Sequence, residues 1–256
     1  EAASEVELET EFLGPDGEVL TSFADSRTMD EDTTIEQPVR IANPQFWSVE
    51  TPRLYTARST IRVDGVAVDR YETRFGIRSI EFDARKGFLL NGRRLPLNGV
   101  CMHHDLGPLG TAVNRAALRR QLETLKEMGA NAIRTSHNPP APELLELADE
   151  MGILVIDEAF DEWRGAKVEN GYHILFDEWA EKDLRAFIRR DRNHPCVIMW
   201  SLGNEVGEQR NTEYGREVCQ FLHDIARDED PTRPVTAGFN NPAGACSTCD
   251  GLGLKS

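Results

Sequence analysis

The opening part of the chain alternates polar and apolar residues with the period of two that a half-buried β-strand shows. In residues 5–12 every second residue is a glutamate, and the turn sequence Gly-Pro-Asp-Gly follows. We expect further strands over residues 34–41, 54–63 and 66–75, the last two joined by Asp64-Gly65, a dipeptide typical of a hairpin. Short strands at this spacing predict a small antiparallel β-sandwich.

From about residue 87 the pattern changes to short apolar runs that alternate with longer amphipathic segments. The apolar runs predict strands over residues 95–103, 131–135, 153–157, 197–202 and 234–237. The amphipathic segments predict helices over residues 142–151, 177–190 and 212–226. A further helix starts at the capping residue Asn114 and carries the apolar stripe Leu118, Leu122, Leu125 and Met128. Apolar strands that alternate with helices predict a parallel sheet covered by helices.

A sheet of this kind is either an open doubly wound sheet or a (β/α)₈ barrel. No expected strand is followed by the GxGxxG or P-loop motif of nucleotide-binding sheets. Instead, polar residues follow the strands, where a barrel builds its active site. These residues are His103, His104, Asp105, Arg134, His137, Asp157, Glu158, Asn204 and Glu205. The sequence therefore favours two domains, a sandwich over residues 1–83 and part of a barrel over residues 84–256.

Charge and composition narrow the class of function. The formal net charge is −15, and an acidic surface repels phosphate backbones and anionic membranes, so we expect neither nucleic acid nor lipid as a partner. No apolar run reaches the length of about 20 residues that a membrane-spanning helix needs. The five cysteines are scattered as in reduced proteins, and Cys246 and Cys249 have no further zinc ligands nearby. No signal sequence is recognisable, and the compartment, cytoplasmic or periplasmic, stays open.

The densest chemical signal is the run RDRNHPCVIMWSLGNE at residues 190–205. A helix end leads through Asn-His-Pro into an apolar strand whose carboxyl end carries Asn204 and Glu205. Cleavage of a glycosidic bond needs a carboxylic acid that protonates the leaving oxygen, and an amide beside it can bond the 2-hydroxyl of the sugar. The Asn-Glu dipeptide alone is more typical of a helix cap or a solvated loop, but the full run indicates a glycosidase.

This run resembles the acid/base signature of glycoside hydrolase family 2. The runs NAIRTSHNP at residues 131–139 and DEMGILVIDE at residues 149–158 resemble the family's other signature. RFGIR at residues 74–78 resembles the link between its immunoglobulin-like domain and its barrel, and DEAFDEW at residues 157–163 is most similar to bacterial β-galactosidases. The resemblance implies an immunoglobulin-like β-sandwich, incomplete at its start, followed by a truncated TIM (β/α)₈ barrel.

The resemblance also implies roles for individual residues. Glu205 corresponds to the general acid/base and Asn204 to its sugar-binding neighbour. His137 and His103 correspond to two histidines that contact the glycone, and Arg134 to the arginine beneath the site. A structural role stays open for two of them, His103 as a hydrogen-bonded core histidine and Arg134 as the partner of a strand carboxylate.

Two further positions are candidates for sugar contacts. Asp105 matches a position at which some family members bind sugar hydroxyls, and Trp163 either stacks on a sugar face or packs locally. Some members bind magnesium through a glutamate and a histidine two residues later, but here Glu162 is followed at that spacing by Arg164, which cannot ligate a metal. We therefore expect no metal and no cofactor.

The resemblance implies hydrolysis of terminal β-D-galactosides by a retaining double displacement, with a β-glycoside as the partner. That mechanism needs a second carboxylate, which the family carries on its seventh barrel strand, whereas the strands expected here end at the fifth. We therefore expect this chain alone to be inactive. The alternatives are a β-glucuronidase or β-mannosidase of the same family, or a non-catalytic carbohydrate-binding remnant. The open edges of a half barrel also favour pairing with another copy, and hence a homo-oligomer.

Overall fold

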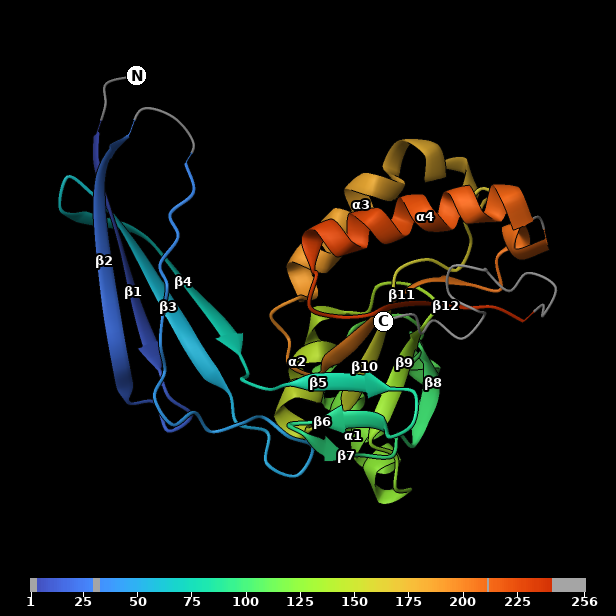
Figure 1. Ribbon diagram of the computed structural model, residues 1–256, viewed down its shortest axis with the longest axis horizontal. Coiled ribbons are helices and arrows are strands. Elements are labelled where there is room, and N and C mark those ends of the chain that lie inside the picture. The colour runs from blue at the N-terminus through green and yellow to red at the C-terminus, as the bar shows by residue number, and fades with distance from the viewer. Residues whose placement is uncertain (1–3, 30–32, 211, 241–256) are drawn as a thin grey trace. The chain divides into compact units, whose positions relative to one another are not determined.

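The computed structural model describes residues 4–29, 33–210 and 212–240 (Figure 1). The chain divides into two compact units, Glu1–Arg78 and Ser79–Ser256. This division precedes the predicted boundary at residue 83, because a short antiparallel sheet that starts at Ile80 belongs to the second unit. The predicted Cys-x-x-Cys pair lies outside the described residues. Within the described ranges, no helix is long and apolar enough to cross a membrane.

The first unit contains a four-stranded antiparallel sheet in the order β2-β1-β3-β4. Its strands are β1 Ser4–Leu13, β2 Val19–Met29, β3 Tyr55–Val63 and β4 Val66–Phe75. The predicted hairpin at Asp64-Gly65 is confirmed, because Val63 pairs with Val66 and both turn residues have the positive φ values, 48° and 79°, that the tight turn requires. This antiparallel sheet agrees with the β-rich first domain that the sequence predicts.

One predicted strand of the first unit is wrong. Residues 34–41 form no strand, because Pro38 has no N–H to donate and interrupts any ladder through this segment. The segment is still tied to the sheet, since Gln37 Nε2 donates a hydrogen bond to the Leu8 carbonyl at 3.2 Å. The buried Tyr55 ring stacks on Phe75 at a centroid distance of 5.6 Å, which places aromatic packing at one end of the sheet.

The second unit is built on a five-stranded parallel sheet whose strands follow one another in chain order, from β8 to β12. They are β8 Gly99–His103, β9 Ala132–Ser136, β10 Leu154–Glu158, β11 Val197–Asn204 and β12 Val235–Gly238. A doubly wound sheet reverses its strand order, so this uninterrupted order identifies part of a TIM barrel. The first strand is shorter than expected because Pro96 cannot take part in its ladder.

Each of the first four barrel strands is followed by a helix (Figure 1). The helices are α1 Arg115–Glu127, α2 Pro142–Met151, α3 Phe176–Asp191 and α4 Thr212–Glu229. Three short 3₁₀ turns lie in the connections, η1 Gly107–Leu109, η2 Tyr172–Ile174 and η3 Gly207–Arg210. A small antiparallel sheet of β5 Ile80–Asp83, β6 Gly87–Leu90 and β7 Arg93–Arg94 precedes the barrel strands. This antiparallel sheet was not expected from the sequence.

The helix α1 shows which local signals set its length. Asn114 caps it as predicted, because its Oδ1 accepts a hydrogen bond from the Ala117 N–H at 3.0 Å. Leu118 and Leu122 are buried, but Met128 is 71% exposed, so its predicted place in the apolar stripe is wrong. The helix ends at Glu127, and the chain turns away before Met128 can reach the core.

A buried cluster, the clasp formed by Asp149, His194 and Cys196, joins α2 to the start of β11. Asp149 lies on α2 and is 2% exposed. Its two oxygens lie 2.6 Å from His194 Nδ1 and 3.0 Å from the Cys196 N–H. The three side chains are close enough to share a metal ion, but both oxygens already accept hydrogen bonds. Burial also raises the pKa of the Cys196 thiol well above its usual value, which keeps it protonated.

Replacing Asp149 with alanine should lower the free energy of unfolding by about 1–3 kcal/mol, because the Cys196 N–H is left buried without an acceptor. Urea denaturation of residues 1–256, followed by circular dichroism, measures this loss. The matched control is Glu123→Ala on the exposed side of α1. Equal stabilities of the two variants would contradict a structural role for the clasp.

Candidate active site

The carboxyl ends of β8 to β11 bring the predicted site residues to one edge of the sheet. His103 ends β8, and His137 follows the end of β9. Their imidazole rings meet edge to face at a centroid distance of 5.0 Å. Asn204 ends β11, and Glu205 follows it directly. Because the strands are parallel, these residues converge where a barrel carries its active site.

The centre of this edge is Glu158, the last residue of β10. Its side chain is fully buried, and its Oε2 accepts hydrogen bonds from Arg134 Nε at 2.7 Å and from Ser201 Oγ at 2.5 Å. Its Oε1 lies 2.7 Å from His137 Nδ1. A buried carboxylate is stable only when it is paired and hydrogen-bonded, and Glu158 is both.

Arg134 connects this carboxylate to the candidate acid/base. Its Nη2 lies 2.6 Å from Glu158 Oε2 and donates to Asn204 Oδ1 at 3.0 Å. Burial lowers the pKa of Arg134, but the charge and hydrogen bonds of Glu158 outweigh it and raise the pKa above its usual value. The structure therefore gives Arg134 the structural role that the sequence left open, and a contact between Arg134 and sugar stays a prediction.

A second buried carboxylate lies behind Glu158. The Glu158 N–H donates to Thr135 Oγ1 at 2.8 Å, and this hydroxyl donates to Asp157 Oδ1 at 3.1 Å. Asp157 is fully buried. Burial and then the charge of Asp191 raise its pKa well above the usual range, so Asp157 holds its proton.

Asn204 and Glu205 form the tip of β11. Asn204 Nδ2 donates to Asp161 Oδ1 at 3.0 Å, and the Glu205 N–H donates to the Gly238 carbonyl at 2.6 Å. Glu205 has a φ of 44°, a left-handed conformation that costs an ordinary residue about 1–2 kcal/mol. A Cβ at Gly238 would collide with the Arg134 guanidinium, so this approach requires glycine. The Glu205 side chain itself is exposed.

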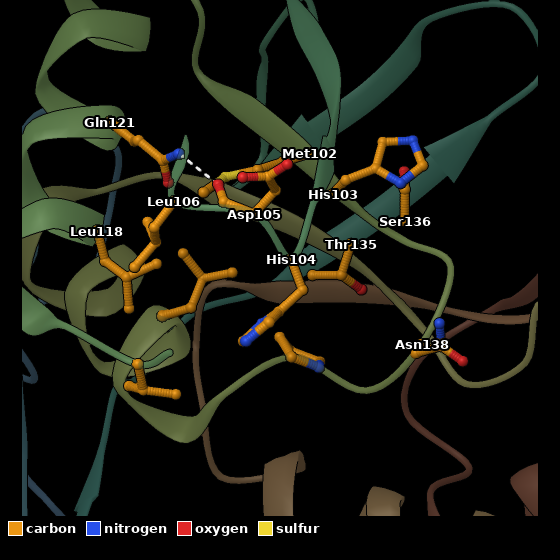
Figure 2. A pocket seen from close by; sticks show the side chains of 13 residues that line it. Met102, His103, His104, Asp105, Leu106, Leu118, Gln121, Thr135, Ser136 and Asn138 are labelled. Carbon is orange, nitrogen blue, oxygen red and sulfur yellow. Dashed lines mark hydrogen bonds between the residues drawn. The ribbon is translucent and has the colours of Figure 1, made fainter. Parts of the chain in front are cut away.

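Two predicted sugar contacts have other surroundings. Trp163 is 1% exposed and its Nε1 donates to the Leu202 carbonyl at 2.7 Å, so the structure supports local packing, one of the two roles that the sequence left open. Asp105 is exposed, and its Oδ1 accepts the Gly107 N–H at 2.6 Å. Figure 2 shows the side chains of His103 and Asp105 pointing in different directions, with Gln121 bonded to the Asp105 carbonyl. Sugar binding by Asp105 stays a prediction.

The position at which some family members bind magnesium does not fit a metal here. Glu162 is 3% exposed, and its Oε2 accepts the Lys167 N–H at 2.6 Å. Its Oε1 accepts the His173 N–H at 2.9 Å. Arg164 binds Asp177 and lies over the ring of Phe176. Both oxygens of the carboxylate therefore hold the loop instead of a cation.

Both units match one protein family. Residues 82–251 match the profile of the glycosyl hydrolases family 2 TIM barrel domain, and residues 1–78 match another profile described as glycosyl hydrolases family 2. The first match alone covers more than half of the chain. The chain therefore belongs to glycosyl hydrolases family 2, as its sequence motifs and barrel indicate.

Similar proteins are named as enzymes with two different activities. The chain is 47% identical to the β-galactosidase BoGH2A of Bacteroides ovatus, over 83% of this chain and 28% of that protein. It is 35% identical to a β-glucuronidase of Bacteroides fragilis, over 79% of this chain and 29% of that protein. A solved family 2 structure from Bacteroides cellulosilyticus has a TM-score of 0.90 and 38% identity, covering 98% of this chain and 32% of its own. The chain thus spans less than a third of each relative.

The buried Asp157 predicts a measurable pH dependence of stability. Its folded-state pKa is raised, so the folded chain keeps a proton that the unfolded chain releases near its ordinary pKa of about 4. The unfolding free energy should therefore fall as pH rises from about 5 toward 8, and Asp157→Asn should flatten this slope.

Urea denaturation of residues 1–256 at several pH values measures the slope. The control Asp16→Asn removes an exposed carboxylate from the turn between β1 and β2 and should keep the wild-type slope. A slope that is the same in Asp157→Asn as in the wild type would contradict the raised pKa, because histidines also titrate in this window whatever Asp157 does.

Proposed function

We propose that the full-length protein containing this chain is a retaining β-glycosidase that hydrolyses terminal β-D-galactosides, with Glu205 as its general acid/base. The observation that carries this proposal is the Asn204–Glu205 pair at the carboxyl end of β11, held by Arg134 and Glu158. The backbone at Glu205 is fixed by its hydrogen bond to Gly238, and its carboxyl group is open to a substrate.

Glu205 would transfer a proton in both steps of the double displacement. Glu205 would first protonate the glycosidic oxygen and then remove a proton from the attacking water. Asn204 donates one N–H of its amide to Asp161, which leaves the second N–H for the 2-hydroxyl of the sugar. His103 and His137, which pack against each other at the same edge, would contact the glycone.

The nucleophile is expected from a part of the family barrel beyond the described residues. A retaining enzyme places its two carboxyl groups about 5–5.5 Å apart. The other carboxylates described near this edge are Asp105, Asp157, Glu158, Asp161 and Glu162, which all lie in or after β8 and β10. We expect none of these five to be the nucleophile, because the family carries it on its seventh barrel strand.

A β-galactoside is preferred because the 47% identical relative is a β-galactosidase. β-Glucuronidase is the second candidate, supported by the relative from Bacteroides fragilis at 35% identity. It is also supported by a solved β-glucuronidase 2 of Bacteroides uniformis, described as covalently bound to a cyclophellitol-6-carboxylate aziridine, with 30% identity and a TM-score of 0.79 over 93% of this chain and 30% of its own. The two substrates differ at C4, where the hydroxyl is axial in a galactoside and equatorial in a glucuronide, and at C6, where a glucuronide carries a carboxylate.

In the full-length protein, Glu205→Gln should lower turnover of β-galactosides with poor leaving groups by about 10²–10⁴-fold, the usual contribution of general acid catalysis. Nitrophenyl galactosides need little protonation, so their first step should lose less. Steady-state kinetics on both substrate types measures the difference, and Glu213→Gln, exposed on α4, is the matched control.

Equal losses on both substrate types would contradict the acid role of Glu205. A higher kcat/KM of the wild-type protein on a nitrophenyl β-glucuronide than on the galactoside would select the second candidate.

Residues 1–256 alone should hydrolyse no glycoside at an appreciable rate, because protonation without a nucleophile forms no glycosyl-enzyme intermediate. An assay of the purified chain with nitrophenyl β-galactoside measures this, with the full-length protein as the reference. Turnover within about tenfold of that reference, abolished by Glu205→Gln, would show that a nucleophile lies within these residues.

A further inference from the structure

The peptide group that joins Asn204 to Glu205 is held from both sides. Its N–H donates to the Gly238 carbonyl at 2.6 Å. Its carbonyl, that of Asn204, accepts a hydrogen bond from the ammonium of Lys167 at 2.6 Å. Glu205 has a positive φ, so this peptide keeps an orientation that a residue with a side chain rarely adopts. Removing either contact would free the peptide to relax.

Lys167 is itself fixed by neighbours from the loop after β10. Its Nζ lies 2.7 Å from Asp161 Oδ1, the same oxygen that accepts Asn204 Nδ2 at 3.0 Å. Its own N–H is bound by the buried Glu162 carboxylate. Its side chain is 26% exposed. The lysine, the aspartate and the asparagine thus form a closed triangle of hydrogen bonds beside Glu205.

The charge of Asp161 and the dipole of the Asn204 carbonyl favour a cationic side chain at position 167. Burial raises the pKa of Asp161, but hydrogen bonds from Lys167 and Asn204 outweigh it, and the pKa is lowered overall. Asp161 is therefore an anion, and the Asn204 carbonyl presents the negative end of its dipole. An ammonium donates to both oxygens at once, whereas an apolar side chain would remove this donor from both and leave Asp161 Oδ1 with Asn204 Nδ2 alone.

We propose that Lys167 is a positioning residue for Glu205, because its ammonium fixes the Asn204–Glu205 peptide and so aims the acid/base at the leaving oxygen. This inference rests on the proposed function. The position of the carboxyl group matters for such a role, because displacing a catalytic group by about 1 Å can lower the rate by about 100-fold. Lys167 itself would not contact the substrate.

The test is steady-state kinetics of Lys167→Met in the full-length protein, on β-galactosides with poor and with good leaving groups. Methionine keeps the length of the side chain and removes the charge. We expect kcat to fall by about 10–100-fold on the poor leaving group, with KM little changed, and to fall much less on the nitrophenyl substrate. Lys167→Arg should recover most of the loss, because the guanidinium also donates to both oxygens.

Two further variants separate positioning from folding. Lys182→Met removes an exposed lysine on α3 and should keep wild-type kinetics. Asp161→Asn removes the anionic anchor of Lys167 while keeping its shape, so it should give a smaller loss with the same dependence on the leaving group. Asp161→Asn tests the proposal if Lys167→Met does not fold.

The outcomes distinguish this inference from the proposed function. If the wild-type protein hydrolyses no β-glycoside, or Glu205→Gln affects both substrate types equally, the proposed function is wrong. Glu205→Gln can show the selective loss while Lys167→Met lowers kcat equally on both substrate types, or on neither. In that case the role proposed for Lys167 is wrong.

Discussion

The candidate site depends on one buried ion pair, that between Glu158 and Arg134. Water cannot stabilise the Glu158 carboxylate, because its side chain is fully buried, so its negative charge requires a cation and further donors. Arg134 and His137 supply them from β9 and its carboxyl end, and Ser201 supplies a further donor from β11. The pair therefore links the carboxyl ends of β9, β10 and β11 by electrostatic attraction as well as by the backbone ladder.

The ion pair also affects the position of the candidate acid/base through Arg134. Arg134 also binds Asn204, and the close approach of its guanidinium explains why Gly238 on the next strand carries no side chain. Glu205 is then placed by its neighbours on both sides, although its own carboxyl group takes part in none of the hydrogen bonds described above. A site built in this way keeps its reactive group exposed and its supporting groups buried, as catalytic preorganisation requires.

Periodicity and resemblance predicted the order of the barrel strands and the positions of His103, His137 and Glu205, because strand ends are readable from apolar runs. The strand predicted over residues 34–41 is wrong because Pro38 has no N–H for a ladder, whatever the alternation of its neighbours. The sequence left the role of Trp163 open between a sugar contact and local packing, because its burial depends on Gly203, where a Cβ would come within 2.8 Å of the indole nitrogen. The central role of Glu158 was not predicted, because it depends on contacts between residues far apart in the chain.

The most direct test of the account is azide rescue of Glu205→Ala in the full-length protein, with identification of the sugar product by NMR. A nitrophenyl β-galactoside forms the galactosyl-enzyme without acid assistance, and azide then attacks its anomeric carbon and displaces the enzyme carboxylate without needing a general base. The account predicts faster turnover with azide and a β-galactosyl azide product. An α-galactosyl azide, or no acceleration by azide, would contradict the assignment of Glu205 as the acid/base.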